Sequence, residues 1–300
     1  MKIVCLIISF LTAAGINGFG ESTGPRSNIG ILDERVPLQI TERGPHHRVW
    51  SRVTQETNQL GRVTSRTNSY TELATGMYYW QDGQWKETLE KIEAFPDGAV
   101  AQNGSHKVIF AININSAGAI DMALPDGKRL RSHVLGLSYF DAATGKSVLI
   151  AELKDSSGSI LQPNQVIYSD AFTDLHADVR YTYRRSGLEQ DVILREAPPA
   201  PEEFGLDSRT TRLQVLTEFE SPTQPAKRQN AFRTGAGNEL IDEHLDFGSM
   251  QMVAGKAFVT GSPDEIGGIP VAKHWLKIEG RDILVEEVPL SAVAPALNHG

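Results

Sequence analysis

Hydrophobic and polar residues alternate most clearly between residues 165 and 196, and this stretch predicts a β-hairpin. Apolar residues fall at every second position from 177 to 183, which is the period of a strand with one buried face. A polar loop at 184–187 ends in glycine, and 188–194 then leads back as the second strand. We expect one face of this hairpin to lie in the core and the other in solvent.

Matching the apolar positions of the two strands fixes the register of this hairpin, because a one-residue slip would place them on opposite faces. On the apolar face of the hairpin, the predicted pairs are Ala177–Leu194, Val179–Val192, Tyr181–Gln190 and Tyr183–Leu188. On the other face, Arg180 lies opposite Asp191 and Thr182 opposite Glu189, which predicts surface pairs that include an ion pair across the strands.

Turn signals recur at short spacing along the rest of the chain, as at Pro125-Asp126-Gly127, and they separate short runs rich in β-branched residues. This pattern is typical of antiparallel strands, and no segment keeps a helical period. We therefore predict an all-β fold, an antiparallel β-sandwich-like architecture with many short hairpins. It holds at most one or two short helices, one of them within 202–212, and a long polar excursion at 220–244.

Shifts in composition divide the chain into segments. Residues 1–20 resemble a signal peptide, and 21–45 form a polar lead-in rich in Gly, Pro and Ser. The β-rich module covers 46–290, with a possible internal boundary at the proline-rich connector 197–203, and 291–300 form a tail.

The N-terminal segment predicts export. Lys2 precedes an apolar run, and small residues at Gly18 and Gly20 fit a cleavage site. An uncleaved anchor is the alternative, but the run is shorter than the roughly 20 residues of a spanning helix. Cleavage would remove Cys5, the one cysteine, and with it any disulfide, thiol nucleophile or cysteine-ligated metal. We expect an extracellular, cell-surface or periplasmic protein with no membrane span after cleavage.

The net charge of −8 and the pI near 5.5 argue against nucleic acid as a partner, because phosphate binding needs a basic surface. Trp80 and Trp85 are the candidate ligand-binding residues. Asp82-Gly83 between them predicts a two-residue hairpin loop that places the two indoles opposite each other. Such a pair stacks on a sugar or, more often, closes one edge of a core.

Candidate catalytic and metal sites are weak. A glycosidase needs two carboxyls on either side of one bond. The pairs to consider are Glu189 with Asp191, Glu202 with Glu203, and Glu286 with Glu287. Glu286 and Glu287 are neighbours on a strand and point to opposite faces. Asp170, Asp174 and Asp178 lack the spacing of a calcium loop. We predict no catalytic residue, no metal and no cofactor.

The central hairpin resembles a motif of very large secreted bacterial proteins. The stretches 168–181 and 187–194 are similar to the Tyr…Phe…Asp-Leu…Gly…Asp-Ile-x-Leu pattern in N-terminal β modules of RHS/YD-repeat wall-associated and polymorphic-toxin-like proteins. The flanking stretches 127–139 and 210–219 resemble the same module, and the resemblance covers about 45–290. It implies a β module without known catalytic residues. In those proteins the chain continues into repeats or further β domains.

Two functions follow as hypotheses. The first is a non-enzymatic exported β module for presentation, adhesion or assembly of a larger RHS/YD-like protein, with other β modules or repeats as partners. The alternative is a carbohydrate-binding or carbohydrate-active protein with a surface glycan as partner. Two carboxyls about 5–10 Å apart in a cleft would favour a carbohydrate-active enzyme.

Overall fold

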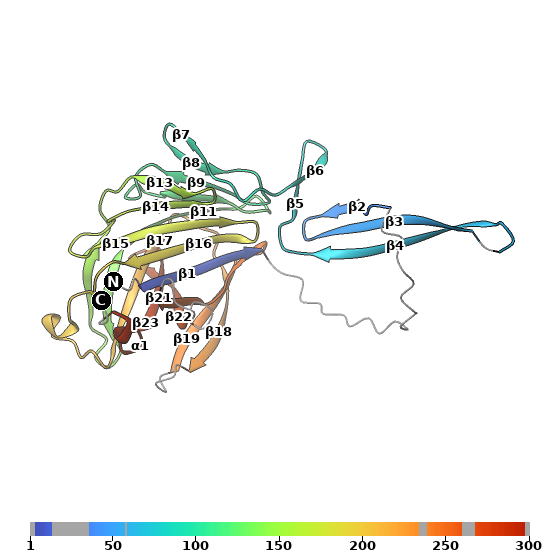
Figure 1. Cartoon of the computed structure of the whole chain (residues 1–300). Helices are drawn as coiled ribbons and strands as arrows, with labels where there is room; N and C mark the ends of the chain where they lie inside the picture. Colours follow the sequence, from blue (N-terminus) through green and yellow to red (C-terminus); the bar gives the residue numbers. More distant parts are fainter. Residues whose placement is uncertain (1–3, 14–35, 58, 234–238, 260–267, 298–300) are drawn as a thin grey trace. The chain divides into compact units, whose positions relative to one another are not determined.

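A computed structural model describes residues 4–13, 36–57, 59–233, 239–259 and 268–297. The chain forms two compact units (Figure 1). The larger unit combines Met1–Ala14 with Glu90–Gly300, and the smaller unit is Gly15–Leu89. The sequence pattern predicts one continuous module over 46–290 and gives no sign of the division at residue 90.

The larger unit is built from antiparallel strands, and the predicted all-β class is confirmed. They form a continuous sheet of 18 strands. The strands are β1 (Val4–Ala13), β7 (Glu93–Phe95), β8 (Gly98–Ala101), β9 (Lys107–Ala111), β10 (Ile120–Ala123), β11 (Arg129–Asp141), β12 (Ser147–Glu152), β13 (Gly158–Gln162), β14 (Gln165–Tyr168), β15 (Ala177–Arg184), β16 (Gly187–Leu194), β17 (Thr211–Phe219), β18 (Ala226–Arg233), β19 (Glu239–Asp246), β20 (Met250–Met252), β21 (Gly255–Val259), β22 (Ile269–Ile278) and β23 (Arg281–Pro289).

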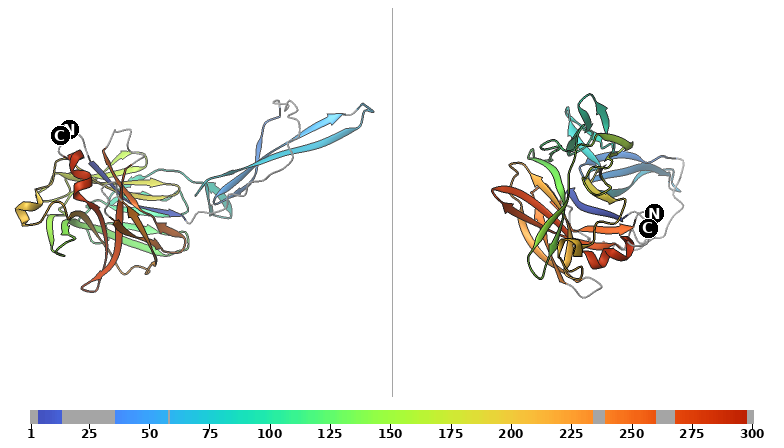
Figure 2. Two further views of the ribbon diagram at one scale, coloured as in Figure 1. Left: turned by 90° about the horizontal axis from the view of Figure 1, so that it is seen from below. Right: turned by 90° about the vertical axis from the view of Figure 1, so that its left-hand side faces the viewer.

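The sheet folds over on itself at β22, whose first residues pair with β21 while the remainder pairs with β23. One layer runs from β13 through β14, β15, β16 and β1 to β21. The other runs from β7 through β8, β9, β10, β11 and β17 to β23 (Figure 2). Aromatic side chains meet between the layers, as Phe110 of β9 and Tyr181 of β15 do at 5.9 Å between ring centroids.

Four buried tyrosines of this core have hydrogen-bonded hydroxyl groups. Each donates its hydroxyl hydrogen to an acceptor: Tyr139 to the Pro199 carbonyl, Tyr168 to that of Ala111, Tyr183 to that of His106, and Tyr181 to the Gln190 side chain. A phenol therefore adds apolar area to the core without leaving its polar end unpaired.

The register predicted for the central hairpin is confirmed pair by pair, with Val179 opposite Val192. Two expectations for it are wrong. Arg184 pairs with Gly187, so the loop is two residues rather than four. The face that carries Arg180 and Asp191 is not a solvent surface, because Asp191 is 1% exposed and accepts a hydrogen bond from Arg180 Nε at 2.7 Å. Both faces of β15 and β16 carry buried residues.

Two other segments differ from the pattern. The polar excursion predicted at 220–244 contains strand β18 and most of β19, which pair with each other as antiparallel strands. Short helical segments are few, as predicted: the 3₁₀-helix η1 (Pro201–Phe204) and the helix α1 (Leu290–Leu297), which begins at the predicted tail. Among the described residues, no helix has the length and apolar character needed to span a membrane.

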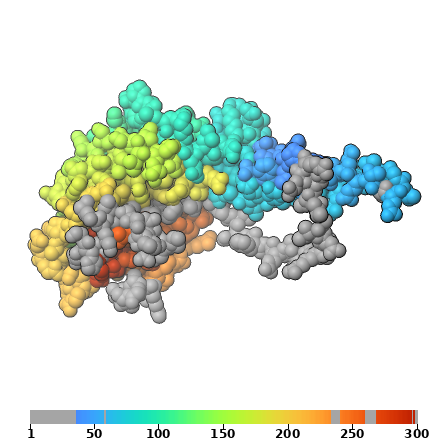
Figure 3. All heavy atoms as spheres, in the orientation of Figure 1, coloured from blue at the N-terminus to red at the C-terminus, as the bar shows by residue number. Residues whose placement is uncertain are grey.

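The smaller unit contains a three-stranded sheet of β2 (Gln39–Gly44), β3 (His47–Thr57) and β4 (Val63–Leu73), and a hairpin of β5 (Tyr78–Gln81) and β6 (Gln84–Glu87). β2 lies within the range predicted as a lead-in. The 11-residue strands β3 and β4 extend beyond β2 as a two-stranded ribbon, drawn in blue in Figure 3. Along that extension Val53 and Val63 are 53% and 55% exposed.

Candidate functional site

The two tryptophans lie opposite each other on the β5–β6 hairpin, as the sequence predicts. Asp82 and Gly83 both have positive φ, 54° and 76°, which is the conformation of a type I′ turn. The rings are 5.1 Å apart between centroids and 73° from coplanar, an edge-to-face contact. Trp80 is 60% exposed and Trp85 is half-buried, so this pair presents an indole to solvent rather than closing a core.

The hairpin carboxylates Glu189 and Asp191 are each occupied by an arginine. Asp191 pairs with Arg180, and Glu189 pairs with Arg184. Both carboxylates are buried, while the two arginines are partly exposed. The interpretation of this pair of acids as partners in ion pairs rather than a catalytic dyad is supported by these contacts.

Glu286 and Glu287 lie on opposite faces of β23, as their adjacency predicts. Glu287 accepts hydrogen bonds from Gln214 Nε2 at 2.8 Å and from Arg212, and His274 lies 3.4 Å away. Burial alone would raise the pKa of Glu287, but the hydrogen bonds of His274 and Gln214 and the charge of Arg212 hold it below the usual value. This carboxylate is therefore ionised at neutral pH and serves to pair three side chains.

Glu286 faces the interior, where it borders a cavity of about 40 Å³ between the two layers of the sheet. The other lining residues are mostly apolar, among them Met122, Leu130 and Leu188. A space of this size has room for only a few water molecules. It is too small for a sugar or a peptide.

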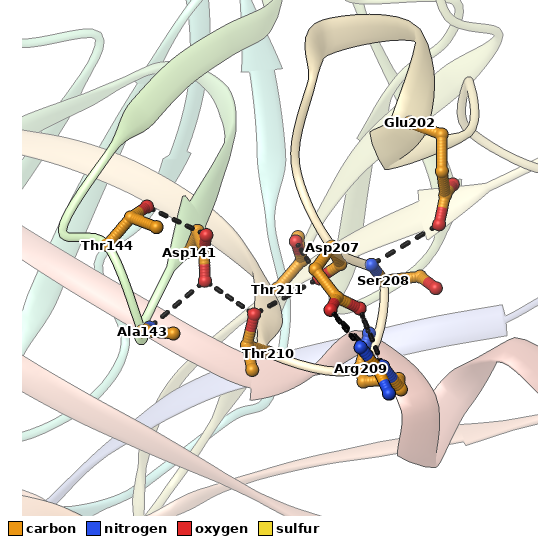
Figure 4. A network of polar contacts seen from close by, with 9 residues as sticks. All are labelled: Asp141, Ala143, Thr144, Glu202, Asp207, Ser208, Arg209, Thr210 and Thr211. Carbon is orange, nitrogen blue, oxygen red and sulfur yellow. Dashed lines mark hydrogen bonds and ion pairs between the residues drawn. The ribbon is translucent and has the colours of Figure 1, made fainter.

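A polar network joins two loops at one end of β11 (Figure 4). Asp141 Oδ1 accepts hydrogen bonds from the Ala143 amide at 3.0 Å and from Thr210 Oγ1 at 2.5 Å, and Thr144 Oγ1 donates to Oδ2 at 2.7 Å. In the neighbouring loop, Asp207 accepts from the amide and guanidinium of Arg209. A pocket of about 270 Å³ lies beside this network.

The charges of this network do not suit acid catalysis. The hydrogen bonds from Arg209 lower the pKa of Asp207 to about 2. Those from Thr210 and Thr144 lower the pKa of Asp141. A general acid needs a carboxyl that still holds its proton near the working pH. Asp141 and Asp207 therefore function as turn acceptors, and the bond from Thr210 to Asp141 joins the two loops.

The aspartates considered as calcium ligands serve turns and an ion pair. Asp170 and Asp174 have φ of 48° and 54°, the left-handed conformation that Asp tolerates better than most residues. Asp178 is buried, pairs with Arg195 and accepts a hydrogen bond from the Asp170 amide at 2.9 Å. Among the described residues, no group of three or more His, Cys, Asp or Glu could hold a metal ion.

His106 is a buried titratable group that the sequence does not single out. It precedes β9 and its ring packs 4.8 Å from that of Tyr183. Burial lowers the pKa of this imidazole from 6.5 to about 4. The imidazole is therefore neutral in the folded protein at pH 7.

This pKa predicts a measurable loss of stability in acid. In the unfolded chain His106 binds a proton below about pH 6.5, whereas in the folded chain it does so only below about pH 4. Because the unfolded state binds the proton more tightly, acid favours unfolding. Between pH 7.5 and pH 5 we expect this residue to cost about 2 kcal/mol of unfolding free energy. Urea melts at both pH values measure it, with His106→Phe as the control that keeps a ring beside Tyr183. Equal pH dependence in the two proteins would contradict the assignment.

A buried ion pair between β19 and β22 also has no sequence signal. Lys273 Nζ lies 2.9 and 3.1 Å from the two carboxylate oxygens of Asp242, and the Lys273 amide donates to Oδ1 at 3.0 Å. The two side chains are only 1% and 2% exposed. The two residues are 31 positions apart in the sequence, so no local pattern predicts their contact.

Of the segment predicted as a signal peptide, the structure describes residues 4–13, which form β1 and lie between other strands, while the predicted cleavage region at Gly18 and Gly20 lies outside the described residues. On one side β1 pairs with β16, from Val4 opposite Leu194 to Thr12 opposite Gly187. On the other side it pairs with β21 and then with β20. β1 thus completes one layer of the sheet. Compared with protein-family models, with curated proteins and with solved structures, the chain has no match.

Proposed function

We propose that this protein is a non-enzymatic, exported β module that serves in presentation, adhesion or assembly of a larger secreted protein of the RHS/YD-repeat kind. The observation that carries the proposal is the ribbon formed by the outer parts of β3 and β4. Its exposed side chains include Val53 and Val63, and Leu60 is exposed in the segment that joins the two strands. An isolated two-stranded ribbon is only marginally stable in water. Contact with another β module would bury these residues and stabilise it.

The state of the carboxylates also supports a binding role. Glu189, Asp191 and Glu287 are buried in ion pairs, and Asp141 and Asp207 are ionised turn acceptors. Each of these contacts has a role in holding strands or loops together. None of these carboxylates lies across an open cleft from a second carboxyl with a raised pKa, the arrangement that glycoside hydrolysis uses.

Cysteine cross-linking tests the proposal, because Cys5 is the one native thiol and Cys5→Ser removes it. A thiol-reactive cross-linker is attached to Val53→Cys on the ribbon. The matched control is Leu276→Cys, because Leu276 is exposed on the larger unit. The chain is produced in an exporting bacterium together with the product of the neighbouring reading frame. We expect an adduct from position 53 and none from 276. Equal adducts from both positions, or none from 53, would overturn the role of the ribbon.

Export is tested separately by intact-mass analysis of the secreted protein. We expect the mature chain to start after a residue between 14 and 20, because the apolar run is short and small residues follow it. Exported protein that still carries Met1 would exclude a cleaved signal peptide. It would leave the cross-linking result unaffected.

Carbohydrate binding at Trp80 and Trp85 is the second candidate function, and the exposed face of Trp80 favours it. Stacking of a sugar on this indole would quench or shift tryptophan fluorescence. Under the assembly proposal we expect a glycan panel to leave the fluorescence unchanged. A saturable change that Trp80→Ala and Trp85→Ala each abolish, with Trp275→Phe as the control in the larger unit, would instead establish the sugar site.

A further inference from the structure

We infer that the place of β1 in the sheet is a strand-acceptor groove, which receives an extended apolar strand of the larger secreted protein once residues 1–20 have been removed. The inference rests on the proposed function, because it needs a cleaved leader and a β-rich partner. It adds the binding site and the chemistry of the segment that binds there.

The groove is one strand wide and is bounded by strands on both sides. β16 borders it along Gly187–Leu194, while β21 and β20 border it along Gly255–Val259 and Met250–Met252. Among the described residues, β16 makes no ladder with β20 or β21, and β1 supplies the pairing partner of all three. Removing β1 would leave backbone N–H and C=O groups unpaired along two facing edges, which is a strong template for an added strand.

The walls of the groove belong to the hydrophobic core. Leu188 and Val192 on β16 are buried, as are Met250 and Met252 on β20 and Ala257 on β21. An empty groove would expose this apolar surface in the middle of a sheet layer, where the cost of hydration is greatest. The mature protein therefore has a physical reason to take up a replacement strand.

The register specifies what that strand must be. Val4, Leu6 and Ile8 lie opposite Leu194, Val192 and Gln190, positions on the core-facing side of β16. Directly opposed residues of antiparallel strands share a face. An incoming strand thus needs apolar residues at alternate positions over at least five residues, and it must run antiparallel to β16, β20 and β21.

A partner strand fits this groove better than other occupants do. The next segment of the chain, 21–35, contains Pro25 and several polar residues, and proline is excluded from central strands because it cannot donate to the ladder. A second copy would have lost the same leader, and its other described strands already pair within its own sheets. Under the proposed function, the occupant is an extended segment of the larger protein with apolar residues at alternate positions.

The first experiment starts from the full folded chain. A protease site is inserted within 21–35, the purified protein is cut, and a fluorescent peptide of residues 4–13 with a lysine tail is added. We expect residues 1–20 to stay bound after the cut and the labelled peptide to exchange into their place. The matched control peptide carries Leu6→Lys and Ile8→Lys. It should bind at least about 100-fold more weakly, because both lysines would lie opposite core positions of β16.

Two results would overturn the groove itself. One is loss of residues 1–20 after the cut with no change in melting temperature and no uptake of peptide. The other is equal binding of the two peptides, which would indicate nonspecific adsorption. Neither result depends on export, so they are distinct from the finding of an uncleaved leader by mass analysis.

The second experiment identifies the occupant. The exported mature chain is mixed with the protein that the neighbouring reading frame encodes, and the labelled peptide reports whether the groove is free. We expect a 1:1 complex that blocks peptide uptake. A dimer of the chain that blocks uptake, or a complex that leaves uptake unchanged, would overturn the assignment of a partner strand to this groove.

Discussion

Val192→Asp is expected to lower the free energy of unfolding by several kcal/mol, on the order of 4, because it places a charge in the centre of the core. Val192 is fully buried on β16, opposite Val179, and belongs to the hydrophobic cluster between the layers. The net stability of a typical domain is about 5–15 kcal/mol, so this loss would approach the whole margin. Urea unfolding followed by circular dichroism measures it.

Leu149→Asp is the matched control, since Leu149 lies on β12 of the same unit and is 47% exposed. The new carboxylate there stays in water, and we expect a loss within about 1 kcal/mol. Small and equal losses for the two variants would mean that the central hairpin is not part of the core. A variant of Val192 too unstable to purify agrees with the prediction if the Leu149 variant is recovered normally.

Asp242→Leu is expected to cost about 3–5 kcal/mol, because it leaves the buried ammonium of Lys273 without its counter-charge. The lost interactions include both contacts to Lys273 Nζ and the hydrogen bond from the Lys273 amide. Denaturant melts at pH 7 measure the change.

The double variant Asp242→Leu/Lys273→Met separates the cost of the unpaired charge from the loss of packing. With both charges removed, we expect most of the lost stability to return, since a hydrophobic pair of similar volume often replaces a buried ion pair without loss. A double variant no more stable than Asp242→Leu alone would show that the amide hydrogen bond, rather than the ammonium, dominates.

Local features of the sequence were sufficient for the hairpins. Two strands joined by a short loop meet wherever their apolar positions coincide, so the pattern around Val179 and Val192 fixes the register. The turn at Asp82-Gly83 likewise places Trp80 beside Trp85. In both cases the deciding residues lie within a few positions of one another.

The environment of those hairpins could not be predicted in the same way. Alternation indicates that one face is buried, but it does not say whether the polar face is also covered. Asp191 is nevertheless buried, and its ion pair with Arg180 accommodates the charge. Whether the second face of a strand is covered is a property of the whole fold.

The sequence by itself determined the all-β class, the antiparallel hairpins and the turns, because each depends on period-two patterns and on conformations open to a few neighbouring residues. The tertiary structure alone decided which distant strands meet. It placed Lys273 against Asp242 and inserted β1 between β16 and β21. The physical reason is that pairing between distant strands depends on which strand edges the folded sheet leaves open, and no pattern of neighbouring residues contains that information.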